Sequence, residues 1–124
     1  MIEITINGDQ QQVASIEQLE AALVRTEQHS QFELWVLVQN GPRMAMLRNG
    51  MHAWLMYLRF NGDAGFVSQG DPTKTGATSY TLSNGQTDEY PLSWSIDLER
   101  CYRAIMYFFV NEGAKPEWIT WQSS

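Results

Sequence analysis

Apolar and polar residues alternate through the middle of the chain, in segments that are separated by Asn-Gly pairs. Asn tolerates a positive φ and Gly prefers one, so this pair is typical of tight hairpin turns. Asn-Gly pairs stand at residues 7–8, 40–41, 49–50, 61–62 and 84–85. The segments around the middle three pairs are rich in strand-forming residues, which predicts an antiparallel meander over residues 32–39, 42–48 and 51–60.

The segment 51–60 is apolar on both faces of the predicted strand. Trp54, Met56 and Leu58 fall on one face, whereas Leu55 and Tyr57 fall on the other. This pattern predicts an inner strand that is covered on both sides, or half-covered by a partner. Shorter strands are predicted at 65–69, 79–83 and 117–121, with polar loops at 70–78 and 84–94.

Helical periodicity precedes and follows these strands. Ser15 and Gln18 have the spacing of a capping box, and apolar residues then recur at Ile16, Leu19 and Leu23. This combination predicts a first helix that begins directly after Ser15.

The second helical pattern begins near Ser95 or Asp97, either of which is a suitable N-cap. An apolar stripe follows through residues 98–109, and Gly113 and Pro116 are placed to end the helix. The predicted fold class is therefore α+β: an antiparallel sheet with two helices packed against it, in a single domain over residues 1–124.

Composition and charge narrow the class of protein. The 124 residues include 14 acidic and 8 basic side chains, so the net charge is −6. A protein that binds a nucleic acid duplex needs clustered Lys and Arg to replace counterions, so we expect no nucleic acid as a direct ligand. An acidic surface points to a basic partner or serves solubility alone.

Features of secreted and membrane proteins are missing from the sequence. Cys101 is the one cysteine, which excludes an internal disulfide and a CxxC pair. The first residues lack the basic start and apolar run of a signal peptide. The longest apolar run, residues 104–110, is far shorter than the roughly 20 residues of a membrane helix. We therefore expect a cytoplasmic protein that makes no membrane contact.

Two sequence motifs, one of hydrolases and one of nucleotide-binding proteins, are present only in part. Residues 66–70 approach the GxSxG nucleophile elbow around Ser68, but Phe66 replaces the first glycine that the sharp turn needs. Gly65 and Gly70 have the spacing of a phosphate-binding loop, without the Lys-Ser/Thr pair that must follow. Ser68 is accordingly expected to be a residue at the end of a strand.

The remaining candidates for a metal site or a catalytic site lack the second residue that such a site needs. His29 and His52 have no metal-binding spacing, so we expect no metal or cofactor, and His52 is expected in the core or at a sheet edge. Asp88 and Glu89 are adjacent and point to opposite faces of an extended chain, which prevents a catalytic dyad. Cys101 lies on the apolar stripe of the second helix and is expected to be buried. We predict that the protein is not an enzyme.

One segment of the sequence mixes acidic and aromatic residues within turn-rich loops. Aromatic side chains anchor protein interfaces, and charges steer an oppositely charged partner toward them. The alternative is that the aromatic residues belong to the core and the acids only aid solubility. The residues that we expect at a partner-binding face are Asp63, Asp71, Asp88, Glu89, Tyr90 and Trp94.

The order of several short motifs resembles a known family. The motifs are Leu34-Trp35, Tyr57-Leu58, Gly65-Phe66-Val67-Ser68-Gln69-Gly70, Tyr80 before Asn84-Gly85, Glu89-Tyr90-Pro91, Ala104 with Phe108-Phe109, and then Gly113, Pro116, Ile119 and Trp121. Over residues 33–122 this order is similar to the first-numbered family of immunity proteins, the Imm families of bacterial polymorphic toxin and contact-dependent inhibition systems.

The resemblance implies an inhibitor. A cell that delivers a toxin domain into competitors keeps an immunity protein that binds the cognate toxin and blocks it. Such toxins commonly act on nucleic acids, as nucleases and deaminases do, and carry basic clefts that an acidic inhibitor can occupy as a phosphate mimic. The net charge of −6 fits that role. The family supplies no catalytic motif, and Gly65, Gly70, Pro116 and Trp121 match it as structural residues.

Two other functions remain open from the sequence. A small ligand-binding module or enzyme would use a pocket between sheet and helices, with polar groups from His52, Tyr57, Arg59 and Tyr102. Binding of single-stranded nucleic acid on sheet aromatics conflicts with the acidic charge.

Overall fold

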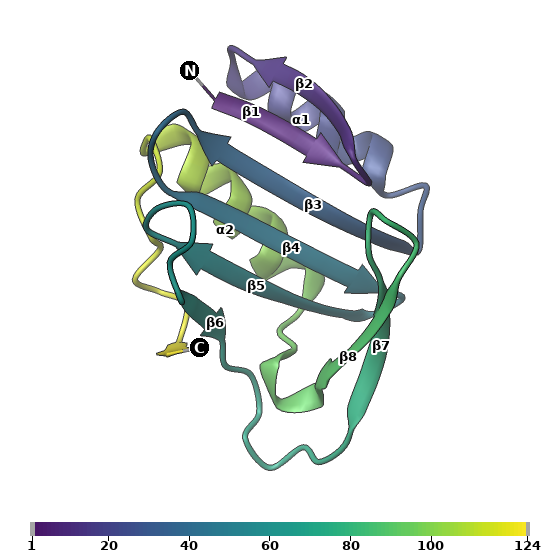
Figure 1. Ribbon diagram of the computed structural model, residues 1–124. Coiled ribbons are helices and arrows are strands. Elements are labelled where there is room, and N and C mark those ends of the chain that lie inside the picture. Colours follow the sequence, from purple (N-terminus) through teal and green to yellow (C-terminus); the bar gives the residue numbers. More distant parts are fainter. Residues whose placement is uncertain (1, 124) are drawn as a thin grey trace.

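The computed structural model describes residues 2–123, in which one large antiparallel sheet carries both α-helices on the same face (Figure 1). Its strand order is β2-β1-β3-β4-β5-β6-β9. The strands are β1 (Ile2–Ile6), β2 (Asp9–Val13), β3 (Gln31–Val38), β4 (Arg43–Asn49), β5 (His52–Leu58), β6 (Phe66–Ser68) and β9 (Trp121–Ser123). The predicted α+β fold class is therefore confirmed.

The central meander follows the Asn-Gly pairs. Strands β3, β4 and β5 pair in sequence order, and Asn40 and Gly50 adopt the positive φ angles, 60° each, that the two connecting turns require. The prediction of a final strand over residues 117–121 is wrong in its start, because residues 117–119 form a turn that buries Ile119. Strand β9 begins at Trp121 instead and pairs with β6.

An additional hairpin at the N-terminus has no counterpart in the predicted strands. Strands β1 and β2 pair across Asn7 and Gly8, whose φ angles are 50° and 89°. Strand β2 reads Asp-Gln-Gln-Gln-Val and is exposed except at Val13, so it lacks the alternation of a half-buried strand. Its place at the sheet edge explains why this polar sequence is tolerated there.

Both helices begin at capping residues. Helix α1 (Ile16–Thr26) starts after Ser15, whose hydroxyl accepts a hydrogen bond from the Gln18 amide at 3.2 Å. The Gln18 side chain accepts from the Ala14 amide, one residue before the position that a capping box uses. Helix α2 (Leu98–Val110) is capped by Asp97 and not by Ser95. Within residues 2–123, no helix is long and apolar enough to cross a membrane.

The core lies between the helices and the sheet, on a face that we call the helix side. Fully buried side chains from both layers fill it, and Cys101 of α2 is among them, as predicted. Gly113 follows α2 with a φ of 99°, and its carbonyl accepts a 2.6 Å hydrogen bond from the Tyr57 hydroxyl of β5. This bond joins the end of α2 to the sheet.

The opposite face, the hairpin side, is covered in part by a second hairpin. It consists of β7 (Ala77–Thr81) and β8 (Thr87–Pro91) and leads into the short 3-10 helix η1 (Leu92–Trp94). The prediction of a loop over residues 84–94 is therefore wrong except at the turn, residues 84–86. Residues 87–91 form β8 and pair with β7, although the segment begins with polar residues. Tyr80 of this hairpin and Trp54 of β5 are buried where the hairpin meets the sheet. Leu55 of β5 is buried on the helix side, which confirms that β5 is covered on both faces.

The Gly65–Gly70 motif holds η1 against the sheet. Ser68 is fully buried; its hydroxyl accepts from the Leu55 amide at 3.0 Å and donates to the Trp94 carbonyl at 2.8 Å. The Gly70 amide donates to the Ser93 carbonyl at 2.7 Å. A Cβ atom on Gly70 would overlap the carbonyl oxygen of Ser95, so this close approach of two backbones requires glycine.

We expect that Gly70→Ala lowers the free energy of unfolding by about 2–3 kcal/mol, because two backbone segments must separate to admit the methyl group. Trp94 moves with η1, so the near-ultraviolet circular dichroism of the tryptophans should weaken as well. The control is Gly41→Ala, whose new Cβ would meet a Val38 side-chain methyl at 3.2 Å. Denaturation with urea should show a change below about 1 kcal/mol for this control; equal losses in the two variants would contradict the assignment.

Candidate functional site

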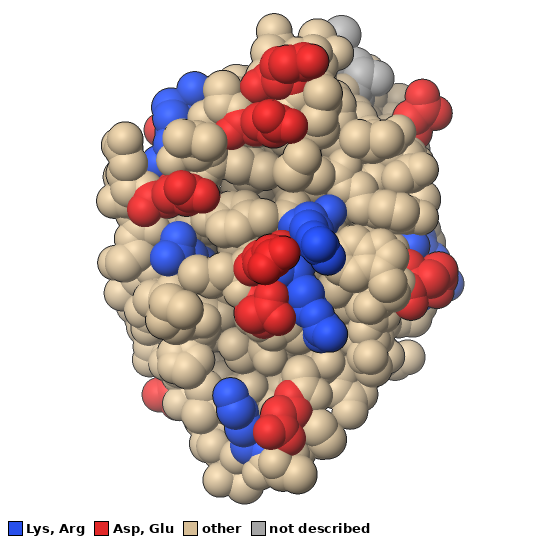
Figure 2. All heavy atoms as spheres, turned by 180° about the vertical axis from the view of Figure 1, so that it is seen from behind, with Lys and Arg blue, Asp and Glu red and all other residues tan. Residues whose placement is uncertain are grey.

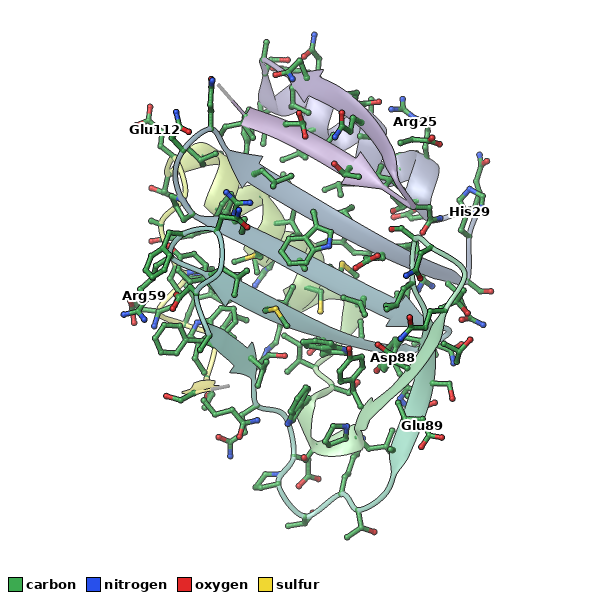
Figure 3. The ribbon with its side chains drawn as sticks, in the orientation of Figure 1. Arg25, His29, Arg59, Asp88, Glu89 and Glu112 are labelled. Atoms are coloured by element: carbon green, nitrogen blue, oxygen red, sulfur yellow. The ribbon has the colours of Figure 1, made fainter. Side chains whose placement is uncertain are left out.

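Five of the six residues expected at a partner-binding face belong to the second hairpin, to η1 or to the loop beside η1, and Asp63 does not. Asp88, Glu89 and Tyr90 belong to β8 and Trp94 to η1. Asp71 directly follows Gly70, which is bonded to Ser93. Figure 3 shows Arg59, the partner of Asp63, on the opposite side of the molecule from Asp88 and Glu89. We call the group Asp71, Asp88, Glu89, Tyr90 and Trp94 the hairpin face.

Asp63 is engaged within the chain itself. Its carboxylate accepts from the Arg59 amide and from two guanidinium nitrogens of Arg59, at 2.8–2.9 Å, and the side chain is 4% exposed. The hydrogen bonds from Arg59 hold the pKa of Asp63 well below its usual range. This carboxylate closes the turn between β5 and β6.

Asp71 shapes the loop between β6 and β7. One of its oxygens accepts from both the Thr73 hydroxyl, at 2.6 Å, and the Thr73 amide, at 2.9 Å. These bonds lower the pKa of Asp71, and its residue remains exposed. The carboxylate is therefore ionised at neutral pH and accessible to a partner.

Asp88 and Glu89 diverge, as predicted for neighbours on an extended chain. Asp88 is half-buried and accepts from the Gln86 amide group at 2.8 Å and the Tyr90 hydroxyl at 3.3 Å, whereas Glu89 is exposed. The charge of Asp88 also acts on Glu33 of β3, so a fourth carboxylate lies near the hairpin face. Glu33 was not among the residues predicted to lie at this face. Its position as an acid within a largely apolar strand indicates a specific hydrogen-bonding role.

Glu33 fastens the tip of the hairpin to the sheet. Its carboxylate accepts from the Ser83 hydroxyl at 2.6 Å, the Ser83 amide at 2.9 Å and the Trp35 indole at 3.1 Å. Burial acts to raise the pKa of Glu33, but the hydrogen bonds from Ser83 and Trp35 outweigh it and the pKa lies below its usual value. The ionised form therefore stabilises the docked hairpin.

The aromatic residues of the hairpin face are partly core and partly surface. The Tyr90 and Trp94 rings stack with centroids 5.6 Å apart, and both pack on buried Trp54, at 4.7 and 5.2 Å. Each keeps part of its surface exposed. Burial is the main cause that raises the pKa of Tyr90, with the Asp88 charge adding to it. The rings are thus held rigidly where a partner can touch them.

An apolar strip continues from the hairpin face across the sheet. Trp35 and Met56 border the cluster around Trp54, and Leu37 and Leu58 follow them at two-residue spacing on the same side. All four are half-buried, in a region that Figure 1 shows beyond the edge of the hairpin. Of these four residues, Met56 and Leu58 were predicted to share one face of their strand.

The other candidates for chemistry are placed in structural roles. The Ser68 hydroxyl is completely buried and bonded to two backbone groups, so it holds the fold together and is not accessible to a substrate. His52 is exposed at the start of the inner strand β5, beside the turn from β4, so, contrary to the prediction, it lies neither in the core nor on an edge strand. Burial raises the pKa of the Cys101 thiol far above its usual value, so it is not activated. No three metal-ligating side chains of residues 2–123 gather in one place.

The four polar residues of the alternative small-molecule pocket are dispersed. His52 and Arg59 lie at opposite ends of β5, and Arg59 is bound to Asp63. The Tyr57 hydroxyl is used by Gly113, and Tyr102 lies between the two helices. These side chains line no common cavity.

We expect that Glu33→Gln lowers the free energy of unfolding by about 1–2 kcal/mol at pH 7, because an amide cannot accept all three hydrogen bonds. The pKa of Glu33 is lower in the folded protein, so its contribution is fully present above pH 4.5, the ordinary glutamate value, and is lost as the pH falls through the folded pKa. Urea denaturation from pH 7 to pH 3 should show the two proteins converging. A constant difference down to pH 3 would contradict this role.

Comparison with known proteins identifies the family of the chain. No curated protein sequence matches the chain. A family model described as immunity protein Imm1 matches residues 7–123, nearly the whole chain. This range includes the motifs on which the resemblance rested and also β2 and α1. The chain therefore belongs to the Imm1 family of immunity proteins.

Proposed function

We propose that this chain protects the cell that produces it by binding, in the cytoplasm, a toxin domain that acts on nucleic acid, such as a nuclease or a deaminase. Membership of the immunity family supports the role of toxin inhibitor. The distribution of acidic side chains supports the basic character of the toxin. Inhibition by binding requires no catalytic step from the immunity protein.

Acidic charge that forms no ion pair on the hairpin face is the observation that carries this proposal. The ion pairs within residues 2–123 are Arg59–Asp63, Arg100–Asp97 and Arg103–Glu99, so none of them includes an acid of the hairpin face. The charge of Lys74 acts on Asp71 alone among these acids. Proteins that act on nucleic acids bind phosphates with clustered Lys and Arg. Carboxylates fixed on a rigid surface present the complementary charge to such a cluster.

The aromatic pair supplies the apolar centre that a stable interface needs. Tyr90 and Trp94 are immobilised by stacking on Trp54, so binding costs little side-chain entropy. The strip that begins at Trp35 and Met56 enlarges the apolar area beside them. Asp63 is left out of the proposed interface, because its carboxylate is bound to Arg59 and its side chain is 4% exposed.

We expect the triple variant Asp71→Asn, Asp88→Asn and Glu89→Gln to associate with the cognate toxin domain about tenfold more slowly at low salt, because electrostatic steering is weakened. Stopped-flow mixing over a range of salt concentrations measures this. The dependence of the association rate on salt should become shallower than in the wild-type protein, and rescue of cells that express the toxin should weaken in parallel.

A matched control removes three exposed acids elsewhere: Glu17→Gln, Glu112→Gln and Glu117→Gln. It has the same net charge as the first triple variant, so any difference between them reports the place of the charge. Equal association rates for the two variants would show that overall charge, and not the hairpin face, guides the toxin.

A further inference from the structure

A groove of about 730 Å³ lies between α1 and α2, on the side of the molecule opposite the hairpin face. Its floor is apolar and includes Leu23 of α1 together with Leu98 and Met106 of α2. Val24 also lines the groove and is 59% exposed, although valine is a poor choice for a solvated helix position. This surface therefore leaves apolar area uncovered between two helices.

The charge left free along this groove is acidic. Glu20 of α1 and Glu27, the C-cap residue of that helix, line it and form no ion pair within the described part of the chain. They are seven residues apart, which places them on the same face of the helix with a rise of about 10.5 Å between them. Val24 stands between them. Figure 2 shows this face, with acidic and basic side chains side by side near its centre and further acidic side chains above them.

The two basic residues of the groove form no ion pair with Glu20 or Glu27. Arg103 pairs with Glu99 on the same helix at 3.6 Å, so these two charges offset each other. Arg48 donates to the Gly50 carbonyl at 2.8 Å and to the Tyr102 hydroxyl at 3.4 Å, which are neutral acceptors, so it keeps its positive charge. Two free carboxylates against one free guanidinium leave the groove acidic on balance.

The groove is rigid before any partner arrives. The Thr26 hydroxyl donates to the Leu23 carbonyl at 2.6 Å, so the Tyr102 hydroxyl, 3.2 Å away, must donate to Thr26. Tyr102 in turn accepts from Arg48. This chain of hydrogen bonds links α1, α2 and β4 beneath the groove, so an occupant meets a surface that is already formed.

We propose that this groove binds an amphipathic helix of a partner protein, one with an apolar stripe flanked by Lys or Arg. The walls are helices whose backbone groups are satisfied internally, so an extended segment would find no backbone partners there, whereas a helix brings its own hydrogen bonds. The apolar stripe covers Val24, and basic side chains two turns apart meet Glu20 and Glu27. The inference does not rest on the proposed toxin interface, which lies on the other side of the sheet.

The test uses two stapled helical peptides with the same leucine stripe, one flanked by lysines and one by glutamates, each carrying a fluorescent label. Fluorescence anisotropy should show the lysine peptide binding at least tenfold more tightly to the wild-type protein. Val24→Asp should weaken that binding about tenfold. Glu20→Lys with Glu27→Lys should reverse the preference, so that the glutamate peptide binds more tightly.

The control variant Glu17→Lys with Glu117→Lys carries the same net charge but changes two exposed acids outside the groove. It should keep the wild-type preference. The proposal is overturned if both peptides bind equally, or if the control reverses the preference as well. It is also overturned if sedimentation shows a dimer that Glu20→Lys with Glu27→Lys dissociates, because the occupant would then be a second copy of this chain.

Discussion

The structure depends on the apolar character of both faces at the centre of the sheet. Strand β5 places Leu55 against the helices and Trp54 against the hairpin, and both side chains are almost completely buried. An antiparallel sheet with polar residues on one face needs a single covering layer, whereas this sheet needs two. The second hairpin and η1 exist as a docked layer because Trp54 requires a cover.

This requirement also explains where the surface chemistry lies. The hairpin covers part of its side of the sheet, so its polar outer edge and stacked rings stand beside a strip of uncovered apolar residues. Carboxylates that hold the fold together, Glu33 and Asp63, are occupied by internal donors. The exposed carboxylates of Asp71 and Glu89 remain available, and they stand beside rigid aromatic groups. Part of the acidic excess of the chain therefore lies beside the aromatic pair on this side of the molecule.

The sheet itself separates the two proposed interaction surfaces. The hairpin face lies on one side, and the groove between α1 and α2 lies on the other. Both are rigid, the first through the stacking of Tyr90 and Trp94 on Trp54 and the second through the hydrogen bonds of Tyr102. Two partners can therefore occupy the molecule without competing for the same residues.

Much of the fold was predictable because its signals are local. Asn-Gly turns fixed the meander, and Ser15 and Asp97 fixed the helix starts, since capping involves neighbours in sequence. Strands β2 and β8 were missed because their sequences are polar and their pairing is set by position in the sheet. The acids of the hairpin face were proposed as partner-binding residues because acidic and aromatic residues are mixed in this part of the sequence. The engagement of Asp63 by Arg59 and the docking role of Glu33 depend on tertiary contacts that no local pattern contains.

The central claim is that the hairpin side of the sheet receives the toxin. Hydrogen exchange measured by mass spectrometry, on the chain alone and with its cognate toxin domain, tests it most directly. The account predicts slower exchange in the loop 70–76 and in the hairpin turn 82–86 on binding, with α1 unchanged. Slowing confined to α1 and α2, with none in the hairpin, would contradict it.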